Sequence, residues 1–380
     1  MPRTIHLTMK MKKNKTLLLS ARDVQEIVLN KGLDEVMDRL IERLEKALQS
    51  YHPDEVEIPM RSGFNYENPV TGLIEWMPLY HKGNDVVIKV VGYHPDNPSE
   101  RNLPTIISSI SAYCTKTGHL KGIIDGVLPT ALRTGASSAV ISKILAKKDS
   151  KTLGLIGCGA QAVTQLHALS RVFDFEKILI FDIDKSAINS FAERINSLQL
   201  NAQIEVSDIT KIIEQSDIVC TATSVEVGKG PLFNGATSKP HLHINAVGAD
   251  FPGKVEIPLS FLQESFVCPD FKSQALVEGE CQRLDEKYIG PDWVQVIQNQ
   301  QDYTKYQNEK TVFDSTGWAL EDWVVTDLFM EYAVELGLGT EVELESMPED
   351  AKSPYEFVRE MPAETLALRE VEYAKTNQNK

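Results

Sequence analysis

The chain has no apolar run approaching the roughly 18 or more residues that a membrane-spanning helix needs. The stretch from Met1 to Lys15 is basic, but only Leu17-Leu18-Leu19 follow it before polar residues resume. Such a run is too short for the core of a signal peptide. We therefore expect a cytoplasmic protein.

Cysteine and histidine are sparse and scattered. The five cysteines contain no pair at CxxC spacing, and the histidines form no cluster with metal-ligand spacing. The sequence therefore predicts neither a disulfide framework nor a metal site. Cys158 lies inside a glycine turn, where we interpret it as a small turn residue rather than a reactive thiol.

Positive charge is also in short supply. The 380 residues carry 39 Lys and Arg against 54 Asp and Glu, a formal net charge of −15. Nucleic acids and anionic membranes require a basic face, so neither is expected as a partner. Small molecules are the expected ligands, and a chain of this length is expected to form two domains.

A dinucleotide site is predicted by the segment from Thr152 to Ala162. An apolar strand ends at Gly157, which allows a tight turn, and Gly159 lets backbone N–H groups approach a pyrophosphate at a helix N-terminus. Apolar residues then recur every three or four positions from Val163 to Phe173, as on one face of a helix. A second strand ends at Asp182, about twenty residues past the turn, where a carboxylate can bind a ribose 2′-OH.

The same segment favours NAD over NADP. Asp182 would repel a 2′-phosphate, and neither Ile183 nor Asp184 supplies a compensating cation. Lys185 keeps NADP open as an alternative. The third position of the glycine motif is Ala162, so the motif alone could also be an ordinary turn.

The fold class predicted is α/β, with a Rossmann doubly wound parallel sheet and a second α+β domain built on an antiparallel sheet. Helices are expected at Ala21 to Asn30, Asp34 to Ser50, Arg133 to Lys148 and Trp318 to Leu336. Strands of the antiparallel sheet are expected at 56–60, 72–79, 86–91, 106–113 and 120–124. Strands of the parallel sheet are expected at 153–156, 178–181, 204–206, 218–222, 242–247 and 266–269.

Two ionisable residues lie within apolar strands of the first region. Alternation places Lys89 on the same face as Val87 and Val91, where a desolvated amine suits a carboxylate ligand. Glu75 also has apolar neighbours, so burial should raise its pKa toward general acid or base duty. Lys89 could instead be an edge-strand lysine that reaches solvent, and Glu75 could face outward.

Three further residues are candidates for binding or chemistry. Arg61 and Arg133 could clamp a carboxylate through paired hydrogen bonds, or could be solvated surface residues. Asp250 follows the strand end at Gly248, where a nicotinamide ring would lie, and could relay protons beside the reacting carbon. It could equally be a loop aspartate in a turn-like sequence.

In this order, these residues resemble the ornithine cyclodeaminase and mu-crystallin family, from about Leu17 to Asp322. The motifs that carry the resemblance are Ile74-Glu-Trp-Met-Pro78, Lys89-Val-Val-Gly-Tyr-His-Pro95, Thr130-Ala-Leu-Arg-Thr134, Gly157-Cys-Gly-Ala-Gln-Ala162, Gly248-Ala-Asp-Phe-Pro-Gly-Lys254 and Phe313-Asp-Ser-Thr-Gly-Trp-Ala-Leu-Glu-Asp322.

The resemblance implies a site and a domain division. Residues 1–135 and 318–380 would form a substrate-binding and dimerisation domain, and residues 136–317 the NAD-binding domain. The substrate amino acid would be held by Arg61, Lys89 and Arg133, with Thr316 near its side chain. Glu75 and Asp250 would be the acid and base, with Lys89 beside them. The cofactor would be lined by Thr105, Arg133, Gly157, Gly159, Ala160, Gln161, Asp182, Thr223, Val247, Gly248, Ala249, Asp250, Lys254 and Ser315.

The resemblance also implies a reaction. The segment from Gly248 to Glu256 is similar to the cyclodeaminase branch, since the mu-crystallin branch lacks the aspartate at position 250. We therefore expect conversion of L-ornithine or a homologue to L-proline or its homologue plus ammonia, with NAD recycled, by a homodimer. The alternatives are a net NAD-dependent amino-acid dehydrogenase or imine reductase, and a mu-crystallin-like small-ligand binding protein. Trp318 and Trp323 near the expected pocket leave the length and polarity of the substrate open.

Overall fold

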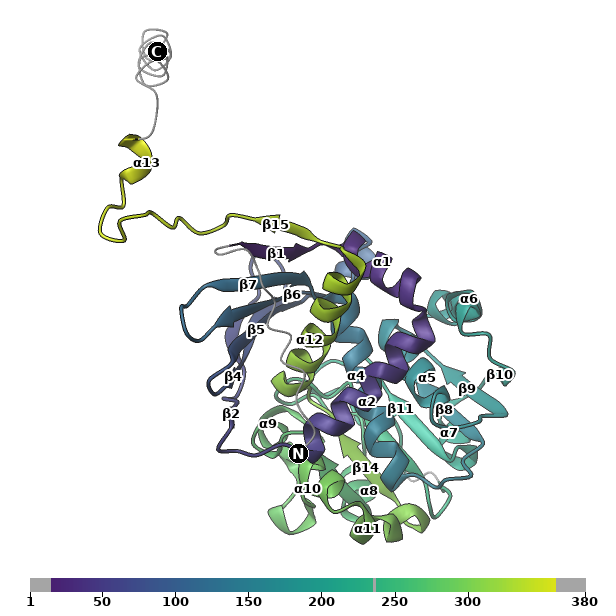
Figure 1. Ribbon diagram of the computed structural model, residues 1–380. Helices are drawn as coiled ribbons and strands as arrows, with labels where there is room; N and C mark the ends of the chain where they lie inside the picture. Colours follow the sequence, from purple (N-terminus) through teal and green to yellow (C-terminus); the bar gives the residue numbers. More distant parts are fainter. Residues whose placement is uncertain (1–14, 235–236, 360–380) are drawn as a thin grey trace. The chain divides into compact units, whose positions relative to one another are not determined.

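The computed structural model describes residues 15–234 and 237–359. Residues Leu17–Thr340 form one compact unit with two β-sheets (Figure 1). A second unit comprises residues 1–16 and 341–380, and its described part contains most of β15 (Thr340–Val342) and the helix α13 (Glu356–Arg359). The outer ends of the predicted substrate domain, residues 1–14 and 360–380, lie outside the described residues.

The first sheet is mixed rather than purely antiparallel. Its strands are β1 (Thr16–Leu19), β2 (Val56–Glu57), β3 (Ser62–Tyr66), β4 (Gly72–His81), β5 (Asp85–Tyr93), β6 (Ile106–Cys114) and β7 (Leu120–Asp125). Strands β4 to β7 pair antiparallel in sequence order, as predicted. The correction comes from β1, an apolar strand that pairs parallel to β7 at Leu17 to Leu19. Strand β2 is shorter than the predicted 56–60, and β3, which pairs with β4, was not predicted.

Side chains alternate across this sheet. On β4, Leu73, Met77 and Leu79 are buried, whereas Ile74 and Tyr80 are exposed on the other face. The buried face packs against α12 (Ala319–Leu336), which crosses β4 and β5 (Figure 1). One face of the sheet thus belongs to the interior, and the other remains open.

The second sheet is fully parallel. Its strands are β8 (Thr152–Ile156), β9 (Lys177–Phe181), β10 (Gln203–Val206), β11 (Ile218–Thr221), β12 (His243–Ala246), β13 (Phe266–Pro269) and β14 (Thr311–Asp314). Their order is β10-β9-β8-β11-β12-β14-β13, so the chain reverses direction across the sheet between β8 and β11. In doubly wound sheets, ligands bind at the carboxyl ends of the strands at this switch point. The prediction of a doubly wound parallel sheet is confirmed, but β14, which lies between β12 and β13, was missed.

Helices pack on both sheets and between them. The remaining helices are α1 (Ala21–Lys31), α2 (Leu33–Gln49), α3 (Asn97–Arg101), α4 (Val127–Leu145), α5 (Ala160–Ser170), α6 (Lys185–Arg194), α7 (Ile209–Gln215), α8 (Leu259–Gln263), α9 (Lys272–Glu278), α10 (Trp293–Gln298) and α11 (Gln300–Tyr303). Within the described residues, none of the helices combines the length and apolarity required to cross a membrane.

The helix α4 corrects one predicted boundary. It begins at Val127, not Arg133, because Pro129 occupies its first turn, where a missing N–H costs nothing. Arg133 therefore lies inside a buried helix that packs against α2, α5 and α12. The predicted domain boundary at residues 135 and 136 falls within this helix, and the division into domains stays a prediction.

Candidate active site

The glycine turn has the geometry of a phosphate-binding turn. Gly157 has a φ of +96°, and a Cβ there would lie 2.5 Å from the carbonyl oxygen of Ala222, so a side chain does not fit. At Gly159, which precedes α5, a Cβ would meet nothing within 4 Å. Open space in front of a helix N-terminus lets a phosphate approach the backbone.

The predicted ribose acid lies beside this turn. Asp182 follows β9, and its carboxylate accepts hydrogen bonds from the backbone N–H groups of Cys158 at 2.6 Å and Asp184 at 2.8 Å. Burial, with Asp182 nearby, raises the pKa of the Cys158 thiol to about 12, which agrees with a small turn residue rather than a reactive thiol. Arg194 was missed: it donates to the carbonyl oxygens of Cys158 and Ala187 and so joins the turn to α6.

The buried carboxylate of Glu256 connects the carboxyl ends of β11 and β12, on the other side of the switch point from the glycine turn. Glu256 accepts hydrogen bonds from Thr221 Oγ1 at 2.7 Å, from the backbone N–H of Thr223 at 2.8 Å and from that of Gly248 at 2.9 Å. These bonds bring the loop after β11 against the predicted cofactor segment Val247, Gly248 and Ala249 after β12. Burial raises the pKa of Glu256. Sequence reasoning did not single out this residue.

The loop after β12 reaches the mixed sheet. Asp250 forms an ion pair with Lys254 at 3.0 Å, and the Lys254 ammonium lies 5.5 Å from the ring centroid of Tyr93 on β5. Burial opposes the charge of Lys254, but Asp250 and Tyr93 raise its pKa. Burial also raises the pKa of Glu75, with a further contribution from Asp250. The charge of Asp250 therefore acts on Glu75, the other predicted acid–base residue.

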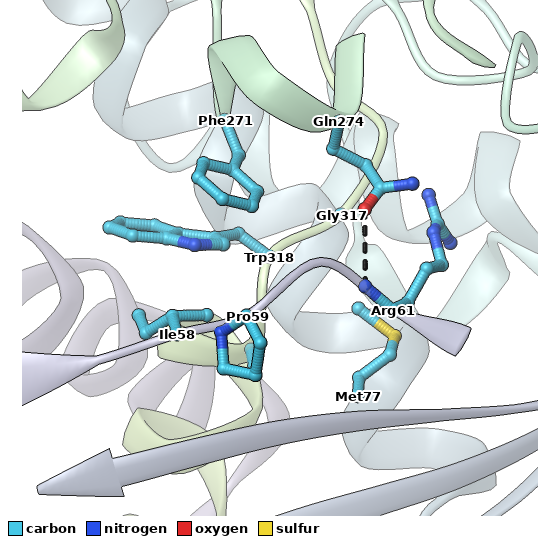
Figure 2. A pocket seen from close by; sticks show the side chains of 9 residues that line it. Ile58, Pro59, Arg61, Met77, Phe271, Gln274, Gly317 and Trp318 are labelled. Carbon is cyan, nitrogen blue, oxygen red and sulfur yellow. Dashed lines mark hydrogen bonds between the residues drawn. The ribbon is translucent and has the colours of Figure 1, made fainter. Parts of the chain in front are cut away.

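Arg61 connects the two sheets. Its guanidinium is 3.7 Å from Glu75, donates to the carbonyl oxygen of Thr316 at 2.7 Å, and forms an ion pair with Glu278 at the end of α9. Its backbone N–H donates to Gln274 Oε1 at 3.2 Å (Figure 2). The side chain of Arg61 is only 9% exposed, so the alternative of a solvated surface residue is wrong.

A pocket opens beside Arg61 (Figure 2). Trp318 stacks on Phe271, with ring centroids 5.6 Å apart, and these rings lie across the pocket from Arg61. The lining is mostly apolar and comes from both halves of the unit: Ile58, Pro59, Arg61, Met77, Phe271, Gln274, Gly317, Trp318 and Ala319. Trp323 instead makes an edge contact with His81.

Lys89 and Arg133 meet two acids of α12. Lys89, only 1% exposed, binds Asp322 at 2.9 Å, and Arg133 Nε is 3.3 Å from the same oxygen. Arg133 also pairs with Glu321. Burial, reinforced by the positive charge of Arg133, lowers the pKa of Lys89 to about 8. Burial raises the pKa of Glu321 to about 7. Lys89 is on an internal strand, so the edge-lysine alternative is wrong.

The segment after β14 brings Ser315 and Thr316 to the same edge. The Ser315 N–H donates to the Ala246 carbonyl at 2.9 Å, and Thr316 Oγ1 donates to Asp270 at 3.0 Å. Ala160 and Gln161 start α5 at the glycine turn. Thr105 lies just before β6, where its carbonyl accepts from His94. Across the described residues, no hydrogen bond or ion pair connects its side chain with the other predicted site residues.

Sequence reasoning missed most of the acids around the site. Glu256, Asp270, Glu278, Glu280 and Asp314 are all buried. A signal existed for Glu321 and Asp322, because they are charged residues in an apolar helix, as Lys89 is in an apolar strand. Despite this acidity, the described parts of the chain contain no group of three or more His, Cys, Asp or Glu that could hold a metal ion.

Comparison with known proteins identifies the family. Residues 20–336 match the family model described as ornithine cyclodeaminase/mu-crystallin family. An L-lysine cyclodeaminase of Streptomyces rapamycinicus is 41% identical over 341 residues, which cover 90% of this chain and 99% of that protein.

Two solved structures are also similar. A lysine cyclodeaminase structure, described as the basis for recognition of L-lysine, L-ornithine and L-2,4-diaminobutyric acid, superposes with a TM-score of 0.87 at 45% identity, covering 90% of this chain and 99% of that one. An archaeal alanine dehydrogenase dimer with bound NAD superposes with a TM-score of 0.77 at 28% identity, covering 87% and 100%. The chain belongs to the ornithine cyclodeaminase/mu-crystallin family.

Proposed function

We propose that this protein is an NAD-dependent cyclodeaminase that converts an L-diamino acid to a cyclic imino acid and ammonia. The observation that carries the proposal is the contact of Glu75 with Arg61 on the mixed sheet, together with the charge of Asp250, after β12 of the parallel sheet, which raises the pKa of Glu75. Ornithine remains a candidate substrate, and the similarity to lysine cyclodeaminase adds lysine.

The residues present fit NAD. The space in front of Gly159 suits a pyrophosphate, and Asp182 at the end of β9 suits an unphosphorylated ribose. When bound there, NAD would accept a hydride from the substrate Cα and return it to the cyclic imine, so that the reaction has no net redox change. The NAD complex of the alanine dehydrogenase relative supports the same cofactor.

The chain's own residues bind the amino acid and move protons. Arg61, Lys89 and Arg133 would hold the substrate carboxylate, with Lys89 and Arg133 kept in place by the acids of α12. Asp250 would accept a proton from the terminal amine, which can then attack the substrate imine carbon as ammonia leaves. Glu75, whose pKa is raised by burial, would donate and accept the remaining protons.

A net dehydrogenase is the second candidate, because of the similarity to alanine dehydrogenase. The two are separated by incubating the protein with NAD⁺ and L-lysine, L-ornithine, L-2,4-diaminobutyrate or L-alanine. Ammonia and products are measured by mass spectrometry, and NADH by absorbance. A cyclodeaminase releases ammonia and cyclic product without accumulating NADH, whereas NADH formed in proportion to product identifies a dehydrogenase. Asp250→Asn should abolish ammonia release while NADH still binds.

Homodimer formation is supported by the open face of the mixed sheet. Cross-strand pairing places Ile107, Gly92, Ile74 and Phe64 in one row, and all three apolar side chains of this row are exposed. Tyr80 and Val90 are exposed on the same face. A contiguous apolar surface of this kind suits a second copy of the chain, and the dehydrogenase relative is described as a dimer.

A further inference from the structure

Glu278 differs from Asp270, Glu280 and Asp314, three other buried acids near the site. Its side chain is only 6% exposed. Asp270 and Asp314 each accept hydrogen bonds from two backbone N–H groups, and Glu280 Oε1 accepts from two more. These carboxylates fix loop conformations. The described partners of Glu278 are the side chains of Arg61 and Gln274. The ion pair and the hydrogen bond with these side chains can break without unfolding a loop.

The cation that neutralises Glu278 has other partners. Arg61 also faces Glu75 and the Thr316 carbonyl, and under the proposed function it turns to the carboxylate of the substrate. Glu278 would then keep a buried negative charge without a full counter-ion, which is costly. Burial, with Glu75 and Asp250 nearby, already raises the pKa of Glu278 to about 7, even though Arg61 acts in the opposite direction.

The balance of charges around Glu278 also indicates an excess of negative charge. Among the described residues, Glu75, Asp250 and Glu278 form ion pairs with two cations, Arg61 and Lys254. Lys89, whose charge also acts on Glu75, is bound to Asp322, and Arg133 pairs with Glu321. A monoamino acid arrives as a neutral zwitterion. A diamino acid arrives with one additional positive charge, which balances the excess carboxylate.

The pocket beside Arg61 is small, about 10 Å³, and movement of Arg61 to the substrate carboxylate would enlarge it. Both side-chain partners of Glu278, Arg61 and Gln274, line it, and Trp318 and Met77 supply apolar walls (Figure 2). Such a lining matches a methylene chain that ends in a charged group.

We infer that Glu278 is the specificity-determining residue that receives the side-chain ammonium group of the diamino acid. The inference rests on the proposed function, because it assumes an amino-acid ligand whose carboxylate takes Arg61. Glu278 thereby makes the site prefer diamino acids over monoamino acids of the same skeleton.

The test compares ligands that differ only in the terminal amine. Binding of L-lysine and L-norleucine, and of L-ornithine and L-norvaline, is measured by calorimetry on the full chain with NADH bound. A charge-assisted hydrogen bond contributes about 1.5–3 kcal/mol, so the wild-type preference for each diamino acid should be roughly 10- to 150-fold. Glu278→Gln should reduce the preference for each diamino acid to about threefold or less. A factor of ten in affinity corresponds to about 1.4 kcal/mol, and the same constant converts the wild-type preference.

Two variants control the experiment. Glu264→Gln removes an exposed carboxylate that pairs with Lys310 away from the site, and should leave the preference unchanged. Glu278→Asp keeps the charge at shorter reach and should retain part of the preference, even if Glu278→Gln folds poorly.

The inference is overturned if Glu278→Gln weakens lysine and norleucine binding equally, since Glu278 would then act only by positioning Arg61. It is also overturned if the wild type binds both ligands alike. Failure of the proposed function is a separate result: the wild type would bind lysine in preference to norleucine but release no ammonia.

Discussion

Replacing Asp322 by asparagine should destabilise the fold strongly. The Asp322 carboxylate is 2.9 Å from the ammonium of Lys89 and 3.3 Å from Nε of Arg133, and all three side chains are buried. Asparagine keeps the shape but removes the charge, which leaves Lys89 in the interior without its hydrogen-bonded counter-ion. Breaking a buried ion pair in this way costs about 3–5 kcal/mol of unfolding free energy.

The protonation of Lys89 should change in the same variant. Burial and Arg133 already lower its pKa to about 8, and Asp322 opposes that shift. Without Asp322 the pKa should fall further, so that Lys89 becomes partly neutral near pH 7 and binds a carboxylate ligand less well. The stability loss and a weaker affinity for amino acids should therefore appear together.

The measurement is equilibrium unfolding in urea at pH 7, followed by tryptophan fluorescence. Glu335→Gln provides a matched control on the same helix, because Glu335 pairs with Lys31 at 2.6 Å but is 58% exposed. An exposed pair contributes about 0–1 kcal/mol. The double variant Lys89→Met with Asp322→Asn removes both charges and should recover most of the lost stability. The reasoning is refuted if Asp322→Asn costs less than about 1 kcal/mol, or if the double variant is no more stable than the single one.

Two further predictions concern the cofactor turn and the open sheet face. Gly159→Ala should leave the thermal midpoint unchanged but weaken NADH binding about tenfold or more in a fluorescence titration, because a Cβ there occupies only the ligand's space. Gly157→Ala should instead lose about 1–3 kcal/mol of stability, since its φ is +96° and a Cβ would strike the Ala222 carbonyl; equal stability of the two variants would contradict this. If the proposed homodimer forms through the open face of the mixed sheet, Val90→Glu should give a monomer in light scattering, whereas Val206→Glu, at an exposed position on the parallel sheet, should not.

The sequence was sufficient to predict structure wherever the determining residues are close together in the sequence. The glycine turn, the helix after it and Asp182 are set by residues within one βαβ unit, and the structure has them as predicted. Alternation along β5 likewise placed Lys89 with Val87 and Val91 on the buried face. In both cases the determining neighbours lie a few positions away in the sequence.

Nonlocal pairing explains what was missed. The strand β14 has four residues, and only Val312 and Phe313 are apolar, so no period is visible in the sequence. It is a strand because β12 and β13 flank it. Glu278 gave no signal either, because its partner Arg61 is more than two hundred residues away in the sequence.

The position of β14 also orders the folding of the nascent chain. During synthesis β13 leaves the ribosome before β14, yet it joins the sheet through β14. Until residues 311–314 have emerged, β12 presents an unpaired edge and the apolar residues of β13 lack their strand neighbour. A ribosome stalled just before this strand would therefore hold a chain with most of its parallel sheet made, and one open edge at which it could aggregate.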